Sequence, residues 1–211
     1  MYFGQNLEDK IIHELITQKY GADFVGSILD IGANDGITLS NSRYFYLQGW
    51  KAHLIEAGKT PFHSLMSNTL TFNNVFSYNV ALGNENKSLT FFESSNLLNQ
   101  FDKGLVSSLI PEETTKWRNA GITYEAYEVQ CYNWDNFLTT NGLKHEKFDI
   151  ISIDIEGMDY EVLSQMNLAE LGCKILCVEF NGANKSKYVE YANNFNLHLV
   201  NENAENLIFA L

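Results

Sequence analysis

The sequence has little proline, little cysteine and few basic residues, and it lacks long apolar runs. Only two prolines occur, and no internal repeat or low-complexity tract interrupts the chain. The three cysteines, Cys131, Cys173 and Cys177, contain no C-x-x-C pair, which argues against a zinc site or a disulfide framework and favours reduced thiols in the cytoplasm. No stretch has the length of a membrane span, and the N-terminus lacks the basic head and apolar core of a signal peptide.

The shortage of basic residues limits the partners. Fourteen Lys and Arg stand against 26 Asp and Glu, so the formal net charge is −12. Such a charge argues against nucleic acid or an anionic membrane surface as the main partner. Hydrophobic residues make up 45% and charged residues 19% of the 211 positions, which is typical of one globular domain spanning residues 1–211. The oligomeric state is not indicated.

The most informative segment is Ser27–Ser40, S-I-L-D-I-G-A-N-D-G-I-T-L-S. A short apolar run ends in a turn with the spacing G-x-x-x-G, and a helix-compatible stretch over 38–47 follows. Glycines let a ligand approach the backbone closely, and a helix N-terminus offers free N–H groups. The turn is neither the dinucleotide fingerprint nor a phosphate loop. Because Asp30 and Asp35 flank it, the turn suits the cationic S-adenosylmethionine better than a pyrophosphate.

A second strand, predicted over Lys51–Ile55, ends in Glu56. Glu56 lies 20 residues after Gly36, at the position where an acidic side chain grips ribose hydroxyls in nucleotide-binding α/β folds. One carboxylate can accept hydrogen bonds from both hydroxyls. This spacing strengthens the prediction of an adenosine-type ligand.

Alternating patterns predict an α/β fold with a doubly wound, mostly parallel sheet. The expected helices cover 6–20, 38–47, a short stretch from Thr60, 159–171 and 185–195. The expected strands cover 28–31, 51–55, 75–82, 88–92, 148–155 and 175–180, with a closing hairpin at 197–201 and 206–210. Ser94–Glu128 has no clear period but carries the aromatic residues Phe101, Trp117, Tyr124 and Tyr127. A long irregular insertion of this kind predicts a lid over the acceptor.

Acidic residues follow two of the predicted buried strands. Asp154 and Glu156 stand two apart in F-D-I-I-S-I-D-I-E-G, as do Glu179 and Asn181 in the next strand. Strand alternation predicts that each pair projects from one face, at the sheet edge where ligands bind. Asp154 and Glu156 are therefore candidate general bases, while Asp154, Glu179 and Asn181 are candidate ligands for Mg²⁺ or Mn²⁺. The sequence does not choose between base and metal.

Taken together, these segments resemble the FkbM family of S-adenosylmethionine-dependent methyltransferases. The matching stretches are Gln5–Asp9 (Q-N-L-E-D), Leu29–Gly36, Gly49–Ala57, Asn79–Leu82 (N-V-A-L), Ser152–Gly157 (S-I-D-I-E-G) and Cys177–Asn181 (C-V-E-F-N). The chain departs from the family pattern at Gly4, where the family has serine, and at Asp159, where it usually has glutamate.

The resemblance implies a Rossmann-like methyltransferase sheet and methyl transfer to a hydroxyl, on a sugar or other small natural-product-like acceptor or glycan. It also implies cofactor contacts from two regions: the first turn and strand ends (Asp30, Gly32, Ala33, Asn34, Asp35, Gly36, Glu56, Ala57 and Asp154), and the segment near the adenine (Asn79, Val80 and Ala81). Two alternatives are a non-catalytic S-adenosylmethionine-binding partner subunit and an NAD-dependent oxidoreductase. The absence of G-x-G-x-x-G counts against the second alternative.

Overall fold

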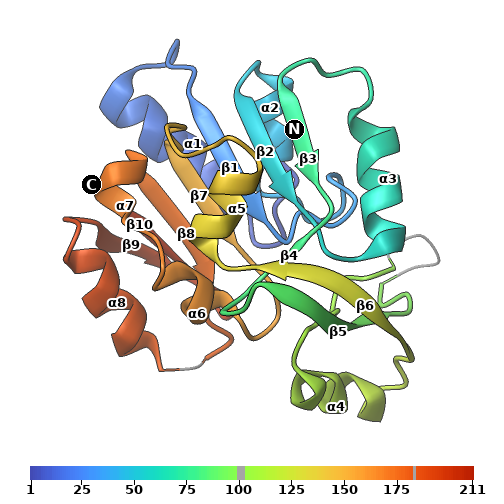
Figure 1. The fold of residues 1–211 in the computed structure, drawn as a ribbon. Coiled ribbons are helices and arrows are strands. Elements are labelled where there is room, and N and C mark those ends of the chain that lie inside the picture. Colours follow the sequence, from blue (N-terminus) through green and yellow to red (C-terminus); the bar gives the residue numbers. More distant parts are fainter. Residues whose placement is uncertain (99–102, 183) are drawn as a thin grey trace.

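A seven-stranded sheet forms the centre of the protein in a computed structural model that describes residues 1–98, 103–182 and 184–211 (Figure 1). The strand order is β3-β2-β1-β7-β8-β10-β9. Its strands are β1 (Ser27–Ile31), β2 (Lys51–Ile55), β3 (Val75–Tyr78), β7 (Ile150–Ile153), β8 (Ile175–Glu179), β9 (His198–Glu202) and β10 (Asn206–Ala210). Strands β3, β2, β1, β7 and β8 pair in parallel, whereas β10 pairs antiparallel with β8 on one side and β9 on the other. The predicted doubly wound sheet with a C-terminal hairpin is confirmed.

Helices cover both faces of this sheet. They are α1 (Glu8–Tyr20), α2 (Arg43–Leu47), α3 (Lys59–Thr69), α4 (Pro111–Asn119), α5 (Trp134–Thr140), α6 (Asp159–Leu163), α7 (Leu168–Leu171) and α8 (Lys185–Asn193). Side chains alternate along β1, so Ile28 packs with the core under α1, α2 and α3, whereas Leu29 and Ile31 pack with α5 to α8. Strands β1, β7 and β8 are buried along their whole length because helices lie on both sides.

A second, three-stranded sheet differs from the expectation of an irregular insertion over 94–128. Its order is β4-β6-β5, with β4 (Ala81–Leu82), β5 (Lys87–Ser94) and β6 (Tyr124–Tyr132), and α4 lies between β5 and β6. Strands β5 and β6 pair antiparallel over eight positions, from Lys87–Cys131 to Ser94–Tyr124. This pairing joins residues 30 to 44 positions apart, so no local period revealed it. Residues 99–102 of the expected lid, Phe101 included, lie outside the described residues.

Several predicted elements are shorter than expected. The strand expected over 148–155 ends at Ile153, and the helix expected over 38–47 is reduced to Arg43–Leu47. The helix expected over 159–171 divides into α6 and α7, because the Asn167 side chain accepts a hydrogen bond from the Glu170 N–H and begins a new helix. Asn133 caps α5, a helix that the sequence reading missed, in the same way.

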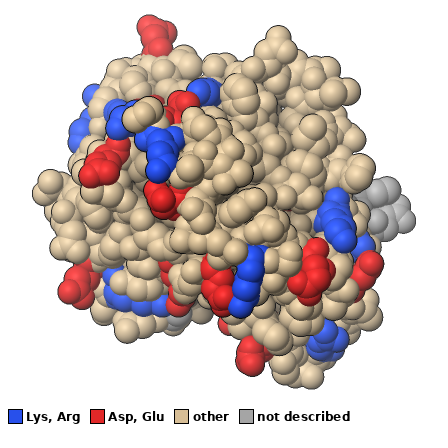
Figure 2. Space-filling model, in the orientation of Figure 1, with Lys and Arg blue, Asp and Glu red and all other residues tan. Residues whose placement is uncertain are grey.

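The surface in Figure 2 shows acidic and basic side chains interspersed among uncharged ones. No helix in the described part of the chain is both long and apolar enough to cross a membrane.

Candidate functional site

A cavity of about 340 Å³ opens at the carboxyl ends of β1, β2, β7 and β8. Parallel strands end at the same edge of the sheet, so residues far apart in sequence meet there. Twelve of the predicted site residues line the cavity: Asp30, Gly32, Ala33, Asn34, Glu56, Ala57, Val80, Ala81, Asp154, Glu156, Glu179 and Asn181. The small sheet and the segment around α4 supply another wall.

Gly32 allows two strand ends to approach closely. Its φ is +93°, and a Cβ at this position would lie 1.7 Å from the backbone oxygen of Asp154. The Asp154 N–H in turn donates to the Ile31 oxygen at 2.9 Å. No residue with a side chain fits here without moving β7 away from β1, so the glycine brings the first turn next to the acidic cluster.

Glu56 is a buried carboxylate that is oriented by backbone N–H groups. Asn34 N–H donates to one oxygen at 2.9 Å and Gly58 N–H to the other at 2.5 Å. Burial raises the pKa of Glu56 to about 7 despite these two bonds. Glu56 lines the cavity, and each carboxylate oxygen can accept more than one hydrogen bond, which suits this residue to bind the two hydroxyls of a ribose.

Asp30 lies at the centre of the same edge. Ser42 Oγ donates to its carboxylate at 2.5 Å, and burial raises the pKa of Asp30 to about 6. Asp30 is therefore a second acceptor on the donor side of the cavity.

Apolar side chains form another part of the cavity wall. The wall combines Val80, Ala81, Leu82, Phe91, Leu105, Val106, Leu109 and Met158. Leu109 and Met158 flank Gly83, at the end of β4. Leu105, Val106 and Leu109 come from the predicted lid, so that segment contributes to this apolar wall.

Three residues expected to touch the cofactor do not line the cavity. The Asp35 carboxylate accepts from Ile37 N–H at 2.8 Å and Thr38 N–H at 2.7 Å and so closes its own turn. Gly36 packs on α3, where a Cβ would lie 2.6 Å from Leu65. The Asn79 amide donates to the Glu56 and Ala57 backbone oxygens at 2.9 and 3.2 Å. These three residues support the cavity loops from behind.

Three of the predicted acidic residues do lie together, but a tight turn after β7 brings them together and not the alternation of side chains along the strand. One carboxylate oxygen from each of Asp154, Glu156 and Glu179 lies within 4.8 Å of the others. Strand alternation does not explain this, because β7 ends before Asp154 and Glu156 has a left-handed φ of +52°. The Asp159 carboxylate, which the sequence reading did not assign to the site, accepts from Ile155 N–H at 2.9 Å and Gly157 N–H at 3.1 Å and holds this tight turn.

Burial raises the pKa of each carboxyl in this cluster. Burial, with the neighbouring Asp159 charge, raises the pKa of Asp154 to about 7. Burial and Asp154 raise the pKa of Glu156 to about 8 and hold that of Glu179 well above its usual range. Only 6% of the Glu179 surface is exposed, and its Oε2 accepts no hydrogen bond from the described residues. The cluster can therefore accept a proton or a cation.

Most of the charged residues that line the cavity are acidic. Seven acidic residues line it, namely Glu8, Asp30, Glu56, Asp154, Glu156, Glu179 and Glu205, against one basic residue among those described, Lys116. Trp117, next to Lys116 on α4, presents a half-buried aromatic surface to the same cavity. Ser108 Oγ donates to the Glu156 backbone oxygen at 2.6 Å and ties the segment before α4 to the acidic turn.

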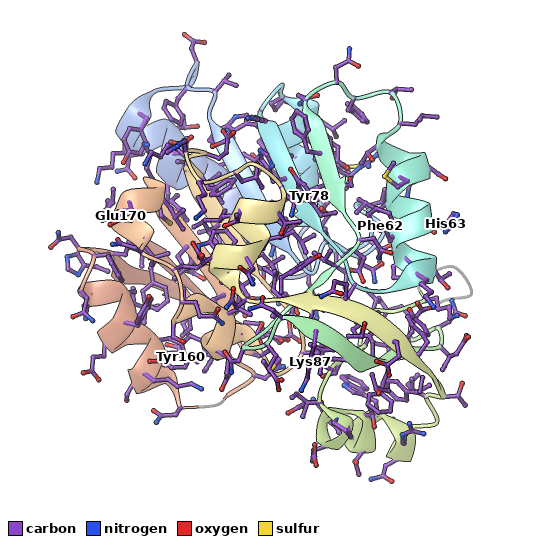
Figure 3. All side chains as sticks on the ribbon, in the orientation of Figure 1. Phe62, His63, Tyr78, Lys87, Tyr160 and Glu170 are labelled. Atoms are coloured by element: carbon purple, nitrogen blue, oxygen red, sulfur yellow. The ribbon has the colours of Figure 1, made fainter. Side chains whose placement is uncertain are left out.

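The five histidines take no part in the cavity wall. His63 projects from the outer side of α3, whereas Phe62 turns toward the sheet (Figure 3). His53 is buried between aromatic rings, and burial lowers its pKa to about 4.

Comparison with known proteins identifies the family of the chain. The family model described as "Methyltransferase FkbM domain" matches residues 30–202. No curated protein matches the sequence.

The chain also resembles solved structures at low identity. A CurJ carbon methyltransferase is 9% identical with a TM-score of 0.50, covering 97% of this chain and 54% of its own. The precorrin-6y C5,15-methyltransferase of Geobacter metallireducens is 10% identical with a TM-score of 0.49, covering 95% and 87%. A TehB-like SAM-dependent methyltransferase of Corynebacterium glutamicum is 12% identical with a TM-score of 0.46, covering 96% and 86%.

Proposed function

Because the chain belongs to the FkbM methyltransferase family and is an S-adenosylmethionine-dependent methyltransferase, we propose that it methylates a hydroxyl oxygen on a sugar or other small natural-product-like acceptor. The observation that carries the proposal is the cluster of carboxylate oxygens from Asp154, Glu156 and Glu179, at the end of the cavity that begins at Glu56. A hydroxyl is a weak nucleophile until it loses its proton, and a carboxylate of raised pKa is suited to remove that proton.

In this proposal the donor lies along the cavity floor. Glu56 would accept the ribose hydroxyls, and the apolar wall from Val80 to Leu82 would hold the adenine. The close approach of Gly32 to Asp154 would place the donor's reactive end beside the acidic cluster. S-adenosylmethionine supplies an already activated methyl group, so the protein's main tasks are to align the acceptor oxygen and exclude water.

Asp154 is the proposed base, with Glu156 as its neighbour in the same turn. The pKa of Asp154, raised to about 7, lets it hold a proton at neutral pH without being permanently protonated. Lys116 and Trp117 lie on the lid side of the cavity, where the aromatic face of Trp117 offers a surface for the acceptor.

A divalent cation fits the same cluster. The unpartnered Glu179 Oε2 and the three oxygens within 4.8 Å provide the hard oxygen ligands that Mg²⁺ and Mn²⁺ prefer. Asp154, Glu179 and Asn181 would hold it, with Glu156 close by. The ion would lower the pKa of an acceptor hydroxyl.

The proposal further places the reaction in the cytoplasm and on a small acceptor. Three buried free thiols suit a reducing compartment, and the acidic cavity and surface disfavour nucleic acid.

The test uses S-adenosylmethionine with a deuterated methyl group and a small-molecule extract of the source cells. We expect a product carrying the label on oxygen, identified by mass and by NMR. Label on carbon or nitrogen would contradict O-methylation. Binding of S-adenosylhomocysteine without any labelled product would favour a non-catalytic partner subunit.

Asp154→Asn keeps the shape but removes the base. We expect methyl transfer to fall by about 10²–10⁴-fold, while the Kd for S-adenosylhomocysteine changes by less than about tenfold. Full activity of this variant would remove Asp154 from the mechanism. The same assay with EDTA decides the metal, because activity that is unchanged by EDTA would leave the carboxylates as bases without an ion.

A further inference from the structure

Glu93 is a buried carboxylate outside the cavity that the proposed mechanism does not use. It lies near the end of β5 with 1% of its surface exposed. Lys103 Nζ forms an ion pair with it at 2.8 Å, the Tyr127 hydroxyl donates to it, and Thr60 N–H donates at 3.1 Å. A buried carboxylate with three donors of this kind is strongly held in place.

These contacts reach the turn that carries the ribose carboxylate. Three successive N–H groups at the start of α3 have acceptors: Gly58 donates to Glu56, Lys59 to the Tyr127 hydroxyl at 2.8 Å, and Thr60 to Glu93. The first N–H groups of a helix have no partner within the helix, so external groups decide its position. Glu93 and Tyr127, both from the small sheet, therefore fix the turn whose first N–H orients Glu56.

The Lys103 segment connects the same sheet to the first cofactor turn. Lys103 Nζ also donates to Thr60 Oγ1 at 3.2 Å, and its backbone oxygen accepts from Asn34 Nδ2 at 3.5 Å. A Cβ at Gly104 would lie 2.9 Å from Pro61 and 3.3 Å from Asn34. The small sheet thus packs closely against both turns that hold Glu56.

We propose that Glu93 is a positioning residue for the adenosine half of the methyl donor. Together with Tyr127 and Lys103, it holds the Glu56–Thr60 turn and Asn34 in the arrangement that accepts the ribose. Glu93 touches neither donor nor acceptor, and the inference does not depend on which atom is methylated.

Calorimetry with S-adenosylhomocysteine and with 5′-methylthioadenosine tests the proposal without an acceptor. Glu93→Gln keeps the side-chain volume but removes the charge that binds Lys103 and Tyr127. We expect the Kd to rise about tenfold, and by the same factor for both ligands, since both carry the adenosine. Glu128→Gln is the matched control: Glu128 lies on β6 of the same sheet, is exposed, and accepts only from Thr90 Oγ1 among the described residues. It should leave both Kd values within about twofold of wild type.

Tyr127→Phe is the second variant, and it removes the hydroxyl shared by Lys59 N–H and Glu93. We expect a three- to tenfold rise in both Kd values. If Glu93 and Tyr127 serve stability alone, these variants will melt at a lower temperature but keep both Kd values within about twofold of wild type. This result would overturn the proposal. A loss confined to S-adenosylhomocysteine also overturns it. If Glu93→Gln does not fold, Tyr127→Phe decides the matter.

Discussion

Glu56 shows how a single side chain links the backbone to a ligand. Its two oxygens are already oriented by Asn34 and Gly58, so its position is set before any donor arrives. Its 7% exposure means that a charge there has little help from water. The donor's hydroxyls would supply the missing hydrogen bonds, and this residue should therefore contribute much to donor affinity.

Replacing Glu56 by Gln should weaken donor binding by roughly 1–3 kcal/mol, the range for losing charge-assisted hydrogen bonds. The NH₂ group of Gln would face a ribose hydroxyl that also donates, so one of the two hydrogen bonds to the ribose would be lost. Calorimetry with S-adenosylhomocysteine measures the change. Glu85→Gln is the control, since Glu85 is exposed and paired with Lys87. Wild-type affinity in Glu56→Gln would show that the ribose binds elsewhere.

Gly32→Ala should prevent donor binding and lower stability. The added Cβ would lie 1.7 Å from the Asp154 oxygen, and the φ of +93° is one that residues with side chains rarely adopt. We expect a loss of about 1–3 kcal/mol or more in unfolding free energy, measured by urea denaturation. Gly49→Ala is the control for the φ effect alone, because φ is +86° there and no atom lies within 4 Å of a Cβ. Equal losses in the two variants would contradict a specific contact at Gly32.

At the scale of elements, the segment between β5 and β6 lines the cavity with two parts. Leu105, Val106 and Leu109 belong to the apolar wall, and Lys116 and Trp117 lie on α4. The two parts can be removed separately.

Two replacements by short Gly-Ser links should behave differently. Removing residues 111–121, which contain α4, should keep the Kd for S-adenosylhomocysteine within about threefold of wild type, because the apolar wall remains. Removing 94–128 should abolish donor binding, since it takes away that wall and part of β6. Calorimetry on both folded variants gives the comparison. Donor binding that survives the larger replacement would show that the segment covers the acceptor alone.

At the scale of the whole molecule, buried carboxyls with raised pKa values dominate the response to pH. Burial raises the pKa values of five carboxyls to about 6–8 in the folded state, from the 3.8–4.5 that Asp and Glu have in an unfolded chain: Asp30, Glu56, Asp154, Glu156 and Asp159. The folded state therefore binds more protons between about pH 8 and 4.5, and the free energy of unfolding rises as the pH falls through this range.

We expect the ligand-free protein to melt at a higher temperature at pH 6 than at pH 8, by about 2–4 °C for each kcal/mol gained. Below about pH 7 the opposite effect of His53 begins and offsets part of this gain, because its pKa falls from 6.5 to about 4 on folding and the unfolded state takes up the proton first. Scanning calorimetry from pH 4 to 8 measures the profile. Asp154→Asn should make the melting temperature depend less on pH near pH 7. A melting temperature that rises from pH 6 to 8 in the wild type would contradict the expectation.

The sequence by itself determined the features that depend on neighbouring residues. The strand, the glycine turn and Asp30 lie within Ser27–Gly36, and Glu56 ends the next strand, so periodicity and turn chemistry were enough to predict these local elements. The pairing of β7 with β8 was also expected, and it brings Asp154 close to Glu179.

Only the tertiary structure decided which distant segments meet. Three kinds of contact join residues 30 to 200 positions apart: the pairing of β5 with β6, the contact of Glu93 with Thr60, and the hydrogen bonds from Gln5 and Asn6 to Glu205. The conformation of Glu156 was also decided there, because Asp159 holds its turn after the strand has ended. Such contacts depend on how whole elements pack together, and a local pattern in the sequence carries no record of that packing.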